Sequence, residues 1–84
     1  MDMNNVKQEL KEMLIERLFL SMTPEEIEND KNLMDEYGID SVSIMEMAVG
    51  LEEMYGISFA DGGFKLDYFK TIDSMAALVE SKAN

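Results

Sequence analysis

The chain has 84 residues, which is enough for one small domain spanning residues 1–84 and leaves no room for a second. Its formal net charge of −11 excludes nucleic acid and anionic membrane as direct partners by repulsion, whereas basic patches on other proteins would be attracted. The sequence has no cysteine and no histidine, which excludes thiol nucleophiles, disulfides, imidazole bases and nearly all zinc chemistry.

The first predicted element is a helix over residues 3–19. Its apolar residues recur at helical spacing and predict a buried stripe, which Ile15 and Phe19 would widen for packing against more than one neighbour. The stripe consists of Val6, Leu10, Met13, Leu14 and Leu18. The basic residues Lys7, Lys11 and Arg17 are expected to pair with glutamates about one turn away on the same helix.

Residues 21–39 form a long connection, and a loop of this length in a compact domain usually has a function. Thr23 is a suitable N-cap and Pro24 a suitable first residue for one or two helical turns over residues 24–28. The following residues 29–32 are expected to be irregular. Four side chains are expected to hold the connection against the core, namely Ile27, Leu33, Met34 and Tyr37.

A second long helix is predicted over residues 41–55. Asp40 is a good N-cap, and Gly38 allows a sharp turn just before it. Gly56 supplies the left-handed conformation that commonly ends a helix. Gly50 lies inside the helix, where glycine costs about 1 kcal/mol relative to alanine, so we expect favourable packing or a closely approaching neighbour there.

The two faces of this helix differ. One face has the spacing of a buried stripe, formed by Ile44, Met47, Ala48, Leu51 and Tyr55. The opposite face mixes apolar with acidic side chains, namely Val42, Met45, Glu46, Val49, Glu52 and Glu53. Because a surface helix needs only one apolar face, the second face is interpreted as a docking surface for partner proteins. The alternative, a helix buried on both sides, would require buried basic partners for the glutamates, and this chain has few bases.

The last third of the chain begins with a connection over residues 58–63, whose conformational freedom is expected to be highest at Gly62 and Gly63. A short helix over residues 64–69 would direct Phe64, Tyr68 and Phe69 inward. Thr71 is then the N-cap of a final helix over residues 72 to about 81, with three buried residues, Met75, Leu78 and Val79. No strand pattern is present, so the predicted fold is an all-α four-helix bundle with three longer helices and one short helix.

Most of the negative charge lies in one part of the sequence. Residues 25–61 contain eleven acids and a single base, Lys31, and Ser41 lies near the middle of this window. The Ser41 hydroxyl would lie beside the unpaired N–H groups at the positive end of the helix dipole. That position favours a phosphate or a phosphodiester.

These residues carry a resemblance to a known family. The run from Gly38 to Val42 resembles the Asp-Ser-Leu signature of acyl carrier proteins, with valine in the leucine position. Leu51 to Ile57 is similar to the family's Leu-Glu-Glu-x-Phe-x-Ile run, and the match continues into Phe69-Lys70-Thr71-Ile72, so it covers essentially the whole chain. The resemblance implies that Ser41 carries a covalent 4′-phosphopantetheine arm derived from coenzyme A, with Asp40 flanking it for recognition by the transferase.

The resemblance also implies a role and a set of partners. The protein would carry acyl groups as thioesters between enzymes of fatty acid, polyketide or related biosynthesis. Its partners would be a phosphopantetheinyl transferase and acyl-transferring or condensing enzymes with basic patches that meet the docking surface. The protein is expected to be a cytoplasmic monomer without a membrane span, since its longest apolar runs are only a few residues. The alternative function is an unmodified acidic helical adaptor that binds basic proteins.

Catalysis is not expected. Ser41 has no histidine or cysteine to pair with, and the sequence contains neither a glycine-rich phosphate loop nor a recognised metal motif. The chain departs from the family pattern at three positions: Val42 replaces leucine, Ser43 stands where an acid is common, and Ala60 stands where proline is usual. The segment over residues 57–69 is also about two residues longer than ordinary short connections between helices. These positions lie on or beside the docking surface, so they bear on the choice of partner enzyme.

Overall fold

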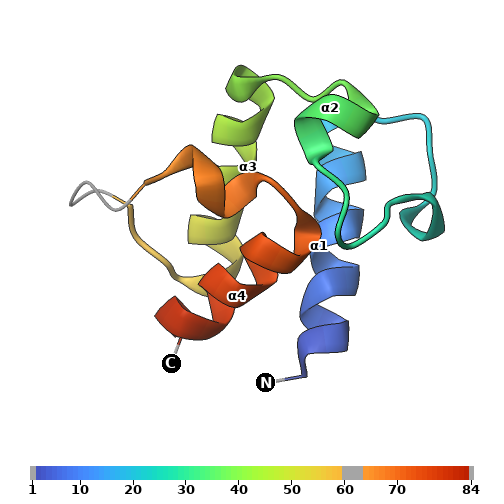
Figure 1. Ribbon diagram of the computed structural model, residues 1–84. Coiled ribbons are helices and arrows are strands. Elements are labelled where there is room, and N and C mark those ends of the chain that lie inside the picture. Colours follow the sequence, from blue (N-terminus) through green and yellow to red (C-terminus); the bar gives the residue numbers. More distant parts are fainter. Residues whose placement is uncertain (1, 60–63, 84) are drawn as a thin grey trace.

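The computed structural model describes residues 2–59 and 64–83 (Figure 1). This part of the chain contains four α-helices and two 3₁₀ turns, in the order α1 (Met3–Leu18), η1 (Pro24–Glu26), α2 (Leu33–Tyr37), α3 (Ser41–Tyr55), η2 (Leu66–Phe69) and α4 (Ile72–Ala83). Three helices are long and one is short, and no strand occurs in the described ranges. The predicted all-α class is confirmed. The predicted freedom at Gly62 and Gly63 concerns positions outside the described residues.

The three long helices enclose one core. α1 packs against both α3 and α4, and η2 lies against α3 and α4. α1 and α3 run in opposite directions, so the end of α1 and the beginning of α3 lie at the same end of the molecule (Figure 1). The core includes most of the residues predicted for the inward faces, with Val6, Leu10, Met13 and Leu14 from α1 and Met75, Leu78 and Val79 from α4 all buried. Leu18, also predicted for the α1 stripe, is half-buried against this core.

A close approach of α1 and α3 explains the glycine within α3. A Cβ added at Gly50 would lie 2.7 Å from both Arg17 Nε and Met13 Sδ, which is shorter than a normal van der Waals contact of a Cβ atom. The predicted close neighbour is therefore α1. Because Gly50 has no side chain, the side chain of Arg17 can lie against α3 at this position and form an ion pair with Glu53.

Two predictions about α1 are wrong. Phe19 was expected to widen the buried stripe, but it follows the helix in a left-handed conformation with φ of 55° and is 90% exposed. The left-handed turn ends the helical spacing on which that expectation rests, and it carries the side chain away from the core. Ile15 is half-buried against the core, as predicted.

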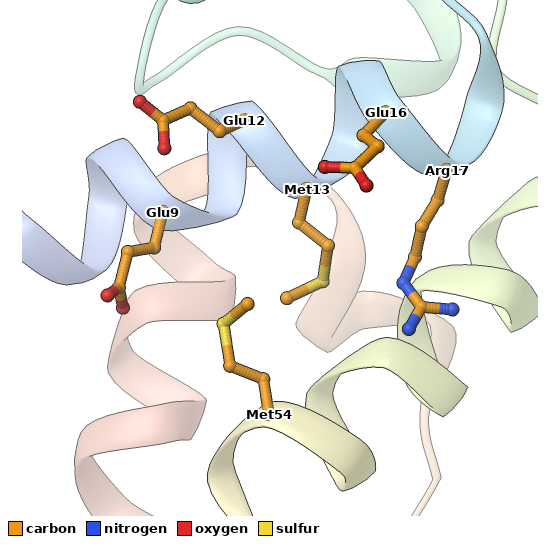
Figure 2. Close-up of a pocket in the computed structure, with 6 residues that line it drawn as sticks. All are labelled: Glu9, Glu12, Met13, Glu16, Arg17 and Met54. Carbon is orange, nitrogen blue, oxygen red and sulfur yellow. The ribbon is translucent and has the colours of Figure 1, made fainter.

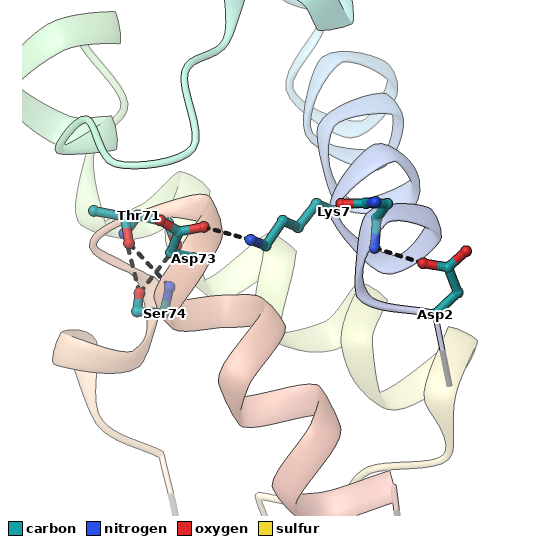
Figure 3. A network of polar contacts seen from close by, with 6 residues as sticks. Asp2, Lys7, Thr71, Asp73 and Ser74 are labelled. Atoms are coloured by element: carbon teal, nitrogen blue, oxygen red, sulfur yellow. Dashed lines mark hydrogen bonds and ion pairs between the residues drawn. The ribbon is translucent and has the colours of Figure 1, made fainter.

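The second correction concerns the basic residues of α1. Lys7 pairs with Asp73 of α4 at 2.9 Å, and Arg17 pairs with Glu53 of α3, so neither forms the ion pair predicted within α1. Figure 3 shows Lys7 extending from α1 to the first turn of α4. Both side chains lie at the margin of the apolar stripe, where a neighbouring helix is within reach. They therefore join α1 to the other two long helices.

The long connection contains an element that was not predicted. Its first turn, η1, is shorter than expected, and α2 follows where only a loop was anticipated. The side chain of Asn32 caps α2 by accepting hydrogen bonds from the N–H groups of Met34 and Asp35, both at 3.0 Å. Leu33 is buried, and its N–H donates to the carbonyl of Lys70 at 2.7 Å. α2 thus fastens the connection to the turn before α4.

The C-terminal part follows the prediction with small differences in length. The expected short helix over residues 64–69 is the shorter 3₁₀ turn η2, in which Phe69 is buried and Tyr68 is half-buried. Phe64 precedes this turn and is also half-buried. Thr71 caps α4 as predicted, because its Oγ1 accepts from the N–H of Ser74 at 2.9 Å. Ser74 Oγ reciprocates by accepting from the N–H of Thr71 at 3.1 Å (Figure 3).

Candidate functional site

The candidate site is the beginning of α3, and its geometry is set by two residues that precede the helix. Gly38 has φ of 66°, a left-handed conformation that ends α2 and turns the chain toward α3. Asp40 is extended, and its Oδ1 accepts from the N–H of Ser43 at 2.8 Å. This bond is the predicted N-cap. Because it stabilises the ionised carboxylate, it lowers the pKa of Asp40 below its ordinary value.

Ser41 is the first residue of α3 and is exposed to solvent. Within the described part of the chain its hydroxyl has no hydrogen-bond partner, so no interaction within the fold would have to break for the hydroxyl to be modified. The first N–H groups of any helix lack an intrahelical acceptor, and the helix dipole places partial positive charge at the same end. The arrangement leaves a free hydroxyl next to groups that favour a negatively charged substituent.

The inward face of α3 is confirmed as part of the core. Ile44, Met47 and Leu51 are fully buried, and Ala48 is nearly so. Tyr55 is half-buried, and its hydroxyl donates to Glu9 of α1 at 2.7 Å. Burial raises the pKa of Tyr55, and the adjacent Glu9 carboxylate raises it further. This face holds α3 in place and takes no part in the candidate site.

The outward face of α3 presents apolar side chains to solvent. Val42 is 76% exposed, Met45 is 50% exposed and Val49 is 44% exposed. The alternative in which α3 is buried on both sides is therefore wrong. These three residues begin directly after Ser41 and continue along the helix at helical spacing.

The three glutamates of the outward face have different surroundings. Glu46 is exposed and has no ion pair with any described residue. Glu52 is half-buried and accepts from the N–H of Phe59 at 2.8 Å, so it fixes the chain after α3. Glu53 forms the ion pair with Arg17. Of these three glutamates, only Glu46 is both exposed and without an ion-pair or hydrogen-bond partner among the described residues.

An apolar groove beside the outward face was missed by sequence reasoning. It has a volume of about 350 Å³ and is lined by Met45, Ala48, Val49, Glu52, Phe59 and Phe64. Phe59 packs edge-on against Phe64, with ring centroids 6.0 Å apart, and Phe64 stacks on Phe69 at 5.3 Å. Sequence spacing could not reveal this groove, because it depends on how the chain after α3 folds back on the helix.

Other kinds of site were also considered. Among the described residues, no group of three or more acidic side chains is arranged to hold a metal ion. Over the same residues, no helix has the length and apolar character needed to cross a bilayer.

Known proteins resemble the chain in sequence and in fold. A family model described as "Phosphopantetheine attachment site" matches residues 8–79. An acyl carrier protein of Coprothermobacter proteolyticus is 27% identical over 81 residues, covering 96% of this chain and 94% of that protein. An acyl carrier protein of Buchnera aphidicola is 32% identical over 59 residues, covering 70% of this chain and 71% of that protein. The solved structure titled "Structure of KstB-PCP(apo)" has a TM-score of 0.78 at 21% identity, covers 95% of this chain and 88% of that chain, and shows a shared fold.

Proposed function

Because the chain belongs to the phosphopantetheine-attachment family of carrier proteins, we propose that it carries acyl intermediates as thioesters on an arm attached to Ser41. The group that this family carries is a covalently attached 4′-phosphopantetheine, and its members are carriers, not catalysts. When bound, the arm supplies a terminal thiol to which an acyl group is linked as a thioester.

The position of Ser41 is the observation that carries the proposal. Its hydroxyl is exposed and unpaired, and the adjacent helix N-terminus favours the charge of a phosphodiester. Ser43 is the only other serine in the first turn, and it is half-buried, with its N–H engaged by Asp40. The residues present therefore suit attachment at Ser41 better than at Ser43.

The attachment reaction needs little from this chain besides the hydroxyl. Ser41 Oγ would form a bond to the pantetheine-linked phosphorus of coenzyme A, while the pyrophosphate P–O bond breaks and adenosine bisphosphate leaves. The hydroxyl proton would pass to a base of the transferase, because this chain has no histidine and the hydrogen bond from Ser43 lowers the pKa of Asp40, which makes that carboxylate a weak base. Asp40 is also exposed, so we assign it a flanking role in recognition by the transferase.

The docking surface proposed here consists of Val42, Met45, Glu46 and Val49, with Glu52 and Glu53 at its margin. Its exposed apolar side chains lie beside an unpaired carboxylate, a combination that suits shallow apolar pockets rimmed by basic residues on partner enzymes. Those partners would be the transferase and acyl-transferring or condensing enzymes of fatty acid, polyketide or related biosynthesis. We further propose that the protein works as a cytoplasmic monomer.

Intact mass distinguishes a carrier from an unmodified acidic adaptor. After incubation with coenzyme A and a phosphopantetheinyl transferase, the chain should gain the mass of one phosphopantetheine. A second increase should follow when an acyl-loading enzyme and its substrate are added, and neutral hydroxylamine should remove it, since hydroxylamine cleaves thioesters. A chain that stays at its sequence mass with several transferases, but still binds basic proteins, would support the adaptor.

Substitutions on the docking surface should impair transfer while leaving the fold intact. Val42→Ala and Met45→Ala should change the melting temperature by no more than a few degrees, because both side chains are largely exposed, and they should slow arm transfer by the transferase. Glu46→Lys should mainly lower the association rate and reduce its dependence on salt, because a charge at the rim steers encounter. Equal transfer rates for all three variants and the wild type would place the docking surface elsewhere.

A further inference from the structure

A second groove lies between α1 and the end of α3. It encloses about 370 Å³ and is lined by Glu9, Glu12, Met13, Glu16, Arg17 and Met54. In Figure 2 the side chains of Met13 and Met54 face each other across the gap between the two helices, with Glu9 on one side and Arg17 on the other. We call it the α1–α3 groove.

The α1–α3 groove is separate from Ser41 and from the apolar side chains of the proposed docking surface. Met54 lies about 120–180° around α3 from Val42, Met45 and Val49, taking 100° per residue. It is also about 20 Å along the helix axis from Ser41, at a rise of 1.5 Å per residue. A partner bound in this groove would therefore leave Ser41 and the apolar side chains of the docking surface accessible. The two surfaces meet only where Arg17 of the groove pairs with Glu53 at the margin of the docking surface.

The floor of the groove is apolar and open to solvent. Met54 is 52% exposed, although it lies at the boundary between two packed helices, and Met13 beneath it is buried. Methionine side chains are flexible and polarisable, so this floor can adjust to the aliphatic part of an incoming side chain. About half of the Met54 surface is open to solvent.

The walls of the groove carry uncompensated negative charge. Glu9 accepts from the Tyr55 hydroxyl and Glu12 from the Gln8 amide, both neutral donors, and Glu16 has no partner among the described residues. The single base in the lining, Arg17, is already paired with Glu53. The three carboxylates are spread along two turns of α1 instead of converging on one point (Figure 2). This spacing suits an extended cationic surface better than a compact ion.

The combination of an apolar floor with acidic walls favours a ligand that is both apolar and positively charged. Lysine and arginine each have an aliphatic stem and a cationic head, so the stem would cover Met13 and Met54 while the head meets Glu12 or Glu16. A second copy of this chain is disfavoured, because both copies would carry a net charge of −11. We propose that the α1–α3 groove is a second docking site, for a partner protein that presents a lysine or arginine beside apolar residues.

The methionines provide reporters for a binding test, and the test does not require that Ser41 be modified. With methionine methyl groups labelled with ¹³C, the chain is titrated with a short amphipathic peptide of lysine, leucine and alanine. The Met54 and Met13 resonances, assigned with Met54→Leu and Met13→Leu, should shift. The double variant Glu12→Gln, Glu16→Gln should weaken the Met54 response by roughly three- to tenfold, as expected for two partly exposed ion pairs. Unchanged Met47 and Met75 resonances would verify that the variant is folded.

Matched controls separate this groove from general attraction to an acidic protein. Glu46→Gln removes a charge from the docking surface and should leave the Met54 titration unchanged, and a peptide with glutamate in place of lysine should give no shift. The Ser41→Ala chain should titrate like the wild type, so the result stands apart from the proposed carrier function. A shift confined to Met45, or a Met54 titration that is insensitive to Glu12 and Glu16, would overturn the proposal.

Discussion

Leu51→Ala is expected to destabilise the domain by about 2–5 kcal/mol, the usual cost of truncating a buried leucine. Leu51 is completely buried on the inward face of α3, in the core that α1 and α4 share. A domain of this length has roughly 4–13 kcal/mol of total stability, so the loss is a large fraction. The melting temperature should fall by roughly 10–30 °C. Thermal unfolding followed by circular dichroism measures this directly.

Val49→Ala is the matched control for Leu51→Ala, because it truncates an aliphatic side chain two residues earlier on the same helix. Val49 is 44% exposed, and alanine has the higher helix propensity, so the melting temperature should stay within a few degrees of the wild type. If Val49→Ala unfolded the domain as strongly as Leu51→Ala, the outward face would be part of the core and could not be a docking surface.

Ser41→Ala is expected to abolish attachment of the arm completely while leaving the fold intact. Alanine has no oxygen with which to form the phosphodiester, and no other group of the chain can replace it at that position. The substitution should cost little stability because Asp40, not Ser41, caps α3, and alanine is well tolerated in the first turn. Intact mass after incubation with coenzyme A and a transferase should equal the sequence mass.

Ser43→Ala serves as the control for that experiment. Ser43 is two residues away in the same turn, and alanine retains its backbone N–H, which makes the larger of its two interactions with Asp40. This variant should therefore be loaded as the wild type is. Loss of loading in Ser43→Ala with retention in Ser41→Ala would reverse the assignment.

The parts of the fold that follow from local sequence were predictable. α3 has the expected bounds because Asp40 and Gly56 define its ends through a capping carboxylate and a left-handed glycine. Thr71 likewise marks the start of α4. The exposure of Val42 and Met45 follows from helical spacing once the opposite face is assigned to the core.

The features that depend on contacts between distant segments were not predictable. Phe19 fits the apolar spacing of α1, but the left-handed turn after the helix decides its exposure, and phenylalanine does not usually adopt that conformation. Arg17 reaches Glu53 only because Gly50 brings α1 and α3 close together. The α1–α3 groove arises from the packing of these two helices, and the groove beside Val49 arises where the chain after α3 folds back on the helix, so neither is visible in the spacing of one helix.

Peptide-level localisation of the attached group tests the central claim most directly. Cleavage of the loaded wild-type chain after glutamate releases a peptide covering residues 37–46, in which Ser41 and Ser43 are the only serines. Fragmentation between these two residues should place the whole mass of one phosphopantetheine on Ser41, with fragments that begin at Val42 unmodified. Finding the group on Ser43, or on any other peptide, would contradict the assignment of Ser41 as the attachment residue.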